Sequence, residues 1–421
     1  MRGLSLGRFP GLFCGEGFSF GVFWYMIIKR TGRRKIMSYD AELAVLKIIL
    51  NYQIPEVSED TRFWMIRTKK GYFYNEFIGK KFVALAWNSI SKDTDFSDQA
   101  KESLKDLIVL EYPEIKRPST VINKCSSFID DVKPNDILVI PSAKSTFITF
   151  AFAGEYYEDD SKTVEIEKTV IYRIDHKDVE INEVSCPYKK RRHIVPIRTV
   201  KSEEINYSLY RAISNYHGIS NLDNYSRYIL SMIYNVYLYR NNLNLIYNVR
   251  KQGAIGPRLL SGILYGTTDY LCNIGIDEHK ISTQVNINSP GPIDFLVVDI
   301  YNFLKTNYLP ILGLLAVAGG GSFLTFKFPG IPQIIKDIFT IPEEIKIKKL
   351  EVEKTELEIF EKKIEIMEKI KSAGINPEDL KKSLNVILDS TSELDVQPIE
   401  TVNITTIDIV EPSEEDESED E

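Results

Sequence analysis

The segment from Thr61 to Val200 constrains the fold most, because strand-like runs rich in β-branched and aromatic residues recur along it with turn residues between them. Strands are predicted at residues 63–67, 81–87, 137–141, 145–156 and 163–174. Helices are predicted at 98–112 and 121–130. A strand-rich unit of this size with two helices is typical of a small α+β barrel. The predicted domain runs from residue 60 to residue 203.

The pattern changes after residue 203, where helices become more frequent. Helices are predicted at 207–216, 224–239 and 258–270, and strands at 243–250 and 281–287. Residues 204–300 therefore predict a second, smaller α+β domain of β-α-β style. Further on, residues 342–371 carry a broad apolar stripe with glutamate and lysine between its members, which predicts an amphipathic helix that binds a partner helix or a second copy of the chain.

Two apolar runs raise the question of a membrane. Residues 17–28 form an uncharged run too short to cross a bilayer, and the positive charges follow it rather than precede it. Residues 1–36 are therefore interpreted as an extension or a mis-called start, with a reverse signal anchor as the alternative. Residues 308–326 hold 19 residues without a charge, about 28 Å as a helix. They predict a transmembrane segment, with a buried hairpin as the alternative because three glycines occupy 319–321.

Charge and composition exclude several classes of protein. The formal charge is −8, but residues 411–421 alone carry eight acidic residues and no basic one, so the other residues sum to zero. That tail is predicted to be disordered, and no overall positive field favours nucleic acid. The cysteines and histidines are scattered and form no metal-ligand spacing. Sequence motifs of hydrolases, metalloproteases and nucleotide-binding loops are absent, so no cofactor, metal site or catalytic residue is predicted and an enzyme is not favoured.

Two local features of the first domain could bind a ligand. Lys189, Lys190, Arg191 and Arg192 form the one dense basic cluster, which would contact phosphates or lie as a solvated loop beside acidic residues 155–160. Aromatic residues are also concentrated in this domain. A barrel core accounts for most of them, yet aromatic walls with a few polar groups are also what stacks a flat base. The aromatic residues concerned are Trp64, Tyr72, Phe73, Tyr74, Trp87, Phe147, Tyr156 and Tyr157.

Residues 62–90, RFWMIRTKKGYFYNEFIGKKFVALAWNSI, and residues 132–141, VKPNDILVIP, carry a resemblance. They resemble the N-terminal domain of some Mrr-type bacterial restriction proteins, which is similar to the PUA and EVE group of pseudobarrels. The resemblance covers about 140 of the 421 residues. It implies a PUA-like pseudobarrel that binds modified or flipped bases. No Mrr catalytic domain follows it.

The resemblance also implies a ligand site. Arg67 and Trp87 fall at the ends of matched strands, Tyr74 on the turn, and Pro141 with Ser142 at the end of a third strand; Asn88 follows Trp87. Two departures place a side chain where the group has glycine, at Ala86 and Asn135, and both put an identical ligand in doubt.

These observations lead to three hypotheses. The first is a non-catalytic sensor or adaptor that binds a modified nucleobase, nucleotide or DNA, takes part in bacterial defence and is tethered at a membrane with most of the chain in the cytoplasm. The second is a structural membrane-associated scaffold without a ligand, which forms oligomers or recruits a partner through residues 342–371. The third is a nuclease with an unrecognised site.

Overall fold

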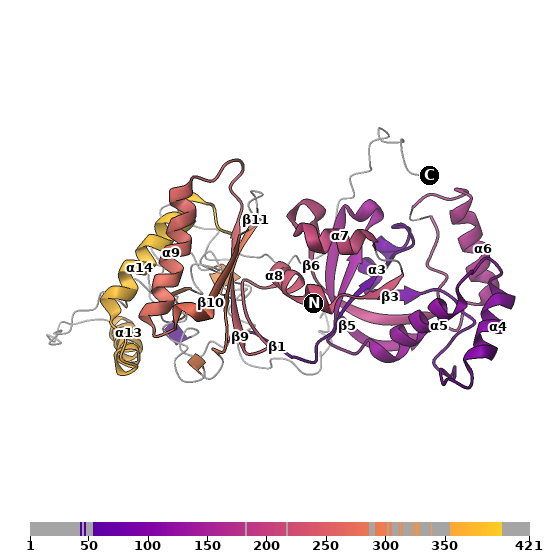
Figure 1. Ribbon diagram of the computed structural model, residues 1–421, viewed down its shortest axis with the longest axis horizontal. Coiled ribbons are helices and arrows are strands. Elements are labelled where there is room, and N and C mark those ends of the chain that lie inside the picture. The colour runs from indigo at the N-terminus through magenta and orange to yellow at the C-terminus, as the bar shows by residue number, and fades with distance from the viewer. Residues whose placement is uncertain are drawn as a thin grey trace, which may run out of the picture.

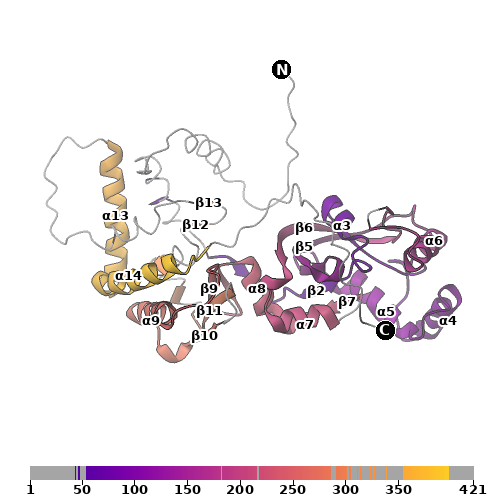
Figure 2. The same cartoon turned by 90° about the horizontal axis from the view of Figure 1, so that it is seen from above.

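The computed structural model describes residues 43, 46–47, 54–181, 183–215, 218–285, 291–300, 303–304, 311, 313–314, 322–323, 326–327, 338 and 354–397. They form two sheet-based units that lie side by side along the long axis (Figures 1 and 2). The expected mixed α+β class is confirmed. The predicted extension 1–36 and the acidic tail 411–421 lie outside the described residues.

The first unit is built on a six-stranded sheet with the order β3-β6-β5-β4-β2-β7. Only β2 and β4 pair in parallel, and the other neighbours are antiparallel. The long strands β5 and β6 slip register after Phe150 and again after Ala153, and such bulges bend a sheet into the half-barrel seen here. The strands are β2 (Phe63–Ile66), β3 (Phe82–Leu85), β4 (Ile137–Pro141), β5 (Phe147–Glu158), β6 (Lys190–Lys201) and β7 (Ile219–Asn221).

Both faces of this sheet are buried, which explains why its central strands are apolar at every position. On β2, Trp64 and Ile66 belong to the core on one face, whereas Phe63 and Met65 belong to the core on the other. Helices α3 (Tyr74–Lys80), α4 (Lys101–Glu111), α5 (Pro118–Ser126) and α6 (Val164–Asp175) contribute to the first core. Helices α7 (Tyr207–Asn215) and α8 (Ser226–Ile233) contribute to the second.

The prediction of a strand at 163–174 is wrong, because these residues form helix α6. Thr163 caps the helix by accepting a hydrogen bond from the Ile166 amide, and Glu165 and Glu167 lie in its first turn, where negative charge is favourable. The β-branched residues of the segment therefore do not decide its structure; the cap and the helical spacing of Glu167 and Ile174, both buried, do. The predicted helix 121–130 continues from α5 into a π-helical turn at Ser127–Asp131.

The second unit is a five-stranded sheet with the order β1-β8-β9-β11-β10. Its strands are β1 (Glu56–Val57), β8 (Val236–Tyr239), β9 (Asn242–Val249), β10 (Ile281–Val285) and β11 (Gly291–Val297). The expected helix 224–239 ends at Ile233, and the next strand begins at Val236. Arg240 and Asn241 both have positive φ, 52° and 61°, which is the backbone of the tight hairpin turn that joins β8 to β9.

Helix α9 (Pro257–Asn273) packs against α14 (Pro377–Glu393), and both cover one face of this sheet (Figure 1). Strand β11 lies between β9 and β10 and is antiparallel to both, so β9 and β10 run parallel to each other and α9 connects them, as the predicted β-α-β unit requires, with β11 inserted between the two strands. Helix α13 (Lys354–Ser372) covers the second part of the predicted helix 342–371. Its apolar residues Ile359, Ile366, Met367 and Ile370 are buried in the core of this unit.

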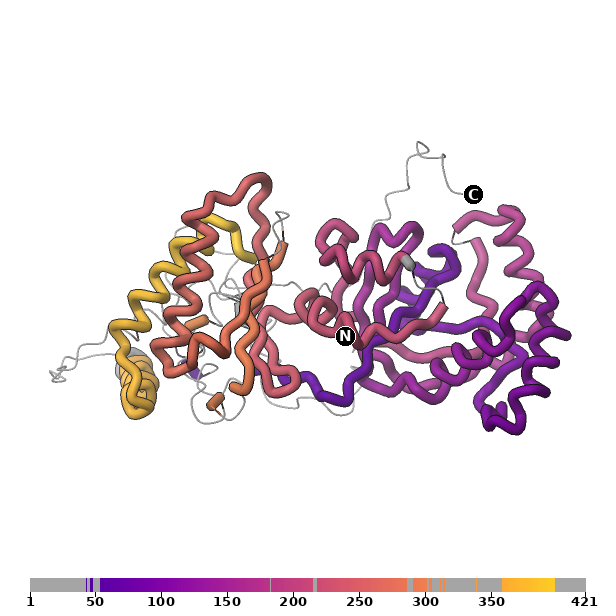
Figure 3. Tube along the Cα trace, in the orientation of Figure 1, coloured from indigo at the N-terminus to yellow at the C-terminus, as the bar shows by residue number. Residues whose placement is uncertain are grey.

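The limits of the two sheets differ from the expected limits of 60–203 and 204–300. Strand β7 and helix α7 lie beyond residue 203, yet β7 pairs with β2 and α7 packs on the first sheet. Strand β1 precedes residue 60 and pairs with β8 of the second sheet. Within its described residues, the chain therefore runs from the second unit into the first and then back, a path that Figure 3 traces by colour.

Most of the candidate transmembrane segment 308–326 lies outside the described residues. Ile311 and Leu314 are described, and both are fully buried in the core of the second unit. The two short strands β12 (Ser322–Phe323) and β13 (Phe326–Lys327) pair with each other. Among the described residues, no helix combines the length and the apolarity that a membrane crossing requires.

Candidate functional site

Trp87 has a backbone conformation that a bulky residue rarely adopts. Its φ is +68°, in the left-handed region, and it follows directly on strand β3 and Ala86. Such a conformation costs roughly 1–3 kcal/mol and persists only where the surrounding structure enforces it. Its cause in this chain is a set of buried charged side chains.

A buried carboxylate holds the amide side of this turn. Glu167 on α6 is 3% exposed and accepts hydrogen bonds from the Trp87 amide at 2.6 Å and the Asn88 amide at 2.7 Å. The hydroxyl of Tyr112 donates to the same carboxylate at 2.8 Å, and burial together with this negative neighbour raises the pKa of Tyr112. Three donors compensate for the desolvation of the Glu167 carboxylate.

A buried ammonium group holds the carbonyl side. Lys190 at the start of β6 is fully buried, and its Nζ donates to the carbonyl oxygens of Trp87 at 2.6 Å and Ile90 at 2.9 Å. Burial lowers the pKa of Lys190. The backbone of Trp87 is therefore fixed at both its N–H and its C=O by buried groups of opposite charge, so the direction in which its side chain leaves the backbone is set before any ligand arrives.

Trp87 is only partly buried, as Tyr72, Phe147 and Tyr156 of this unit also are. The Nζ of Lys124 on α5 lies 6.0 Å from the ring centroid. The indole Nε1–H has no acceptor among the described residues. A partly exposed aromatic face with a free donor at its edge and a cation beside it can bind a flat, polar molecule.

Asn88 is placed next to this ring, as the sequence requires, but its side chain is fully used within the protein. Its Nδ2 donates to the carbonyl oxygens of Lys162, Thr163 and Pro187, and its Oδ1 accepts from the Lys189 amide. The side chain therefore connects the Trp87 turn to the start of α6 and to the segment before β6.

The side chains of the expected ligand residues Tyr74 and Arg67 form their hydrogen bonds with other parts of the fold and not with Trp87. Tyr74 is 5% exposed, and its hydroxyl lies 2.7 Å from Thr149 Oγ1 inside the first core; burial raises its pKa. The guanidinium of Arg67 donates to the carbonyl oxygens of Ile213 and Ser214. The backbone of Arg67 nevertheless comes close to the site, because its amide donates to Gly218 beside Lys124.

Pro141 and Ser142 stabilise the turn after β4. The carbonyl oxygen of Pro141 accepts from the Thr68 hydroxyl at 2.8 Å, and Ser142 Oγ accepts from the Phe147 amide at 2.8 Å. Both contacts are structural, so these residues act on the backbone rather than presenting polar groups to a ligand.

The basic cluster 189–192 is not a surface for phosphates as expected, because β6 carries it into the fold. Arg192 is 2% exposed and donates to the carbonyl oxygens of Gly154, Phe128 and Ile129. The remaining two members are paired with carboxylates: Lys189 with Glu158 and Asp160 at 3.2 and 3.0 Å, and Arg191 with Asp159 at 3.0 Å. Lys190 is buried as well. Side chains alternate between the two sides of a strand, so Lys190 and Arg192 share the buried side of β6, and Arg191 between them lies on the other side.

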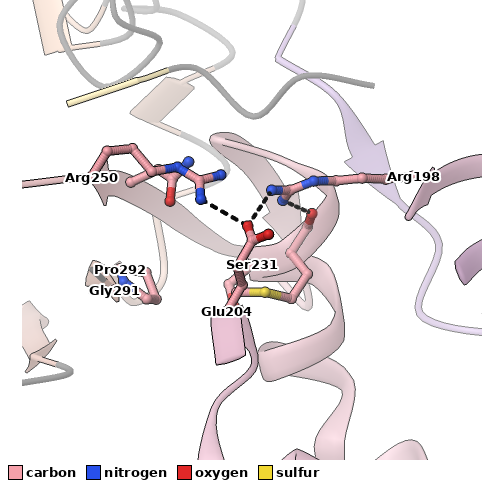
Figure 4. Close-up of a pocket in the computed structure, with 8 residues that line it drawn as sticks. Arg198, Glu204, Ser231, Arg250, Gly291 and Pro292 are labelled. Carbon is pink, nitrogen blue, oxygen red and sulfur yellow. Dashed lines mark hydrogen bonds and ion pairs between the residues drawn. The ribbon is translucent and has the colours of Figure 1, made fainter. Parts of the chain in front are cut away.

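A small pocket lies between the two units (Figure 4). Arg198 and Arg250 converge on one carboxylate, Glu204 Oε2, at 3.4 and 2.8 Å. The free volume is about 10 Å³, close to what one water molecule needs, so a nucleobase does not fit in this arrangement. Its lining consists of Arg198, Glu204, Ser231, Met232, Asn248, Arg250, Gly291 and Pro292.

Within the described part of the chain, no group of three or more histidine, cysteine, aspartate or glutamate residues is arranged to hold a metal ion. Cys125 and Cys186 are buried, and burial raises the pKa of the Cys125 thiol to about 11 and that of Cys186 further.

Sequence reasoning missed Glu167, Tyr112 and Lys124 as members of this site. A signal for Glu167 was present: it shares one helical face with Ile174, and a carboxylate on the buried face of a helix requires partners. The signal is hidden when the segment is interpreted as a strand.

Comparison with protein-family models, with curated proteins and with solved structures finds no match to this chain.

Proposed function

We propose that the protein is a non-catalytic recognition protein whose ligand contains a nucleobase, and that this base stacks on the ring of Trp87. The observation that supports the proposal is the left-handed Trp87, fixed from both sides by the buried groups of Glu167 and Lys190. Trp87 packs against the first core but stays partly exposed, so part of its surface is open to a ligand.

The chemistry of the site fits a flat heterocycle. Stacking on an aromatic ring contributes about 1–3 kcal/mol per base and tolerates different bases. The Lys124 ammonium group lies over the ring and can donate to an acceptor of a bound base, whereas the indole N–H lies in the ring plane and can donate to an acceptor beside the ring. The PUA-like resemblance of residues 60–203 and a role in defence are consistent with such a ligand, and both belong to the proposal.

The test is isothermal titration of the full chain with nucleosides, including modified ones, and with short single-stranded DNA. Trp87→Gly is the decisive variant, because glycine suits the left-handed backbone and removes only the ring. We expect the variant to remain folded and to bind about 5- to 150-fold more weakly, which corresponds to the loss of one stacked base.

A matched control is Tyr172→Ala on α6, since Tyr172 is 60% exposed and lies in the same unit. This variant should bind as the wild type does. If the wild-type chain binds none of these ligands and Trp87→Gly unfolds the first unit in circular dichroism, the ring is a packing element, and the scaffold hypothesis explains the molecule better.

A further inference from the structure

Among the residues that the structure describes, the cation beside Trp87 has no counter-ion. Lys124 is half-buried, and its Nζ forms no hydrogen bond or ion pair with any residue that the structure describes. Its Nζ lies 6.0 Å from the centroid of the Trp87 ring, which is the outer limit for a cation–π contact. Several other lysines of this unit do pair with carboxylates, as Lys189 does with Glu158 and Asp160.

The surroundings of Lys124 are partly desolvated, and burial lowers the pKa of its ammonium group. A charge that is partly removed from water and left unpaired is unfavourable, and an arriving anion relieves that cost. The position of the group is also restricted. A Cβ built on Gly218 would lie 3.1 Å from Nζ and 3.3 Å from Cδ and Cε, so Gly218 leaves just the space that the lysine side chain fills.

We propose that Lys124 binds an anionic group of the ligand whose base stacks on Trp87, so that the site prefers nucleotides to nucleosides. The Nζ of Lys124 lies 6.0 Å from the Trp87 ring centroid, which is near enough for the ammonium group to contact a charged substituent of a heterocycle bound at that ring. The inference rests on the proposed function and adds the class of ligand: a heterocycle that carries a phosphate.

The experiment compares one nucleoside with its 5′-monophosphate and with inorganic phosphate, on the full-length chain, by isothermal titration at two salt concentrations. We expect the monophosphate to bind about tenfold more tightly than the nucleoside at low salt, with the difference shrinking as salt is raised. In Lys124→Gln the two ligands should bind within about twofold of each other, with the nucleoside affinity nearly unchanged.

Two variants keep the test specific. Lys116→Gln removes an exposed charge just before α5 and should keep the tenfold preference. Gly218→Ala adds a methyl group against Lys124, at a residue with φ +70°, and should reduce the preference as Lys124→Gln does.

The possible results separate the two proposals. Equal binding of nucleoside and monophosphate by the wild type overturns the role of Lys124 and leaves stacking on Trp87 intact. Binding of phosphate alone as tightly as the monophosphate also overturns it, because the anion would then bind without the base. Absence of binding by all three ligands overturns the proposed function itself, and this inference with it.

Discussion

Replacing Asp294 with asparagine should stabilise the protein above pH 6 and have little effect near pH 4. Asp294 lies on β11, is 4% exposed, and its Oδ1 has no hydrogen-bond partner among the described residues. Burial raises the pKa of Asp294 to about 6, although the nearby charge of Arg227 on α8 acts in the opposite direction. The hydroxyl of Tyr237 beside them is also buried without a partner.

The sign and size of the effect follow from this pKa. A carboxyl group whose pKa is higher in the folded state binds more protons when folded, so its contribution is most favourable below its ordinary pKa of 3.8 and is lost as the pH rises through about 6. The difference between these pKa values corresponds to about 3 kcal/mol at 1.36 kcal/mol per pK unit. Asparagine cannot ionise, so the variant lacks this loss.

The assay is urea denaturation of the wild type and of Asp294→Asn between pH 4 and pH 8. We expect the free energy of unfolding of the wild type to fall relative to the variant by about 2–3 kcal/mol over this range. Asp299→Asn is a matched control, because Asp299 follows the same strand and is exposed, and asparagine tolerates its positive φ. A difference between wild type and Asp294→Asn that does not change with pH would refute the reasoning.

Two further predictions concern packing and buried polar contacts. Gly262→Ala should lower the free energy of unfolding by about 1–3 kcal/mol, because the added Cβ would lie 2.1 Å from Ser390 Oγ where α9 meets α14. Gly79→Ala is the control, because Gly79 on α3 faces open space and its substitution should cost nothing. Equal thermal stability of the two variants would contradict the packing argument. Asp136→Ala should lower the free energy of unfolding, measured by urea denaturation, by about 2–4 kcal/mol. The reason is that the buried Asp136 carboxylate accepts hydrogen bonds from the Trp64 indole and from the amides of Arg62 and Lys133. A loss below about 0.5 kcal/mol would show that these donors bind water instead.

The sequence predicted the central strands of the first unit because local and tertiary preferences agree there. Strands β2, β3 and β4 are apolar throughout and bounded by turns, and the turn at Asn135 has the positive φ, 73°, that asparagine tolerates. Strand β6 was missed because its first residues are basic, and a strand of lysine and arginine is interpreted as a solvated loop. Only the buried acceptors contributed by distant segments make such a strand possible.

The sequence predicts the site only in part, because the residues that hold Trp87 in place are far from it along the chain. Trp87 was identified as a candidate, but the residues that fix it come from α6 and β6, 80 and 103 positions further along the chain. No spacing rule connects Glu167 and Lys190 to Trp87, because their meeting depends on how the sheet curls. Lys190 was identified for its charge, and its actual contacts with two carbonyl oxygens are visible only in three dimensions.

The most direct test of the central claim is the indole region of the ¹H–¹⁵N spectrum of the full chain during titration with a nucleoside. Trp87→Phe assigns the Trp87 signal, and the Trp64 indole, which donates to Asp136 at 3.0 Å inside the core, is an internal reference. We predict a saturable shift of the Trp87 signal while the Trp64 signal stays in place. A Trp87 signal that does not move at millimolar nucleoside would contradict the account.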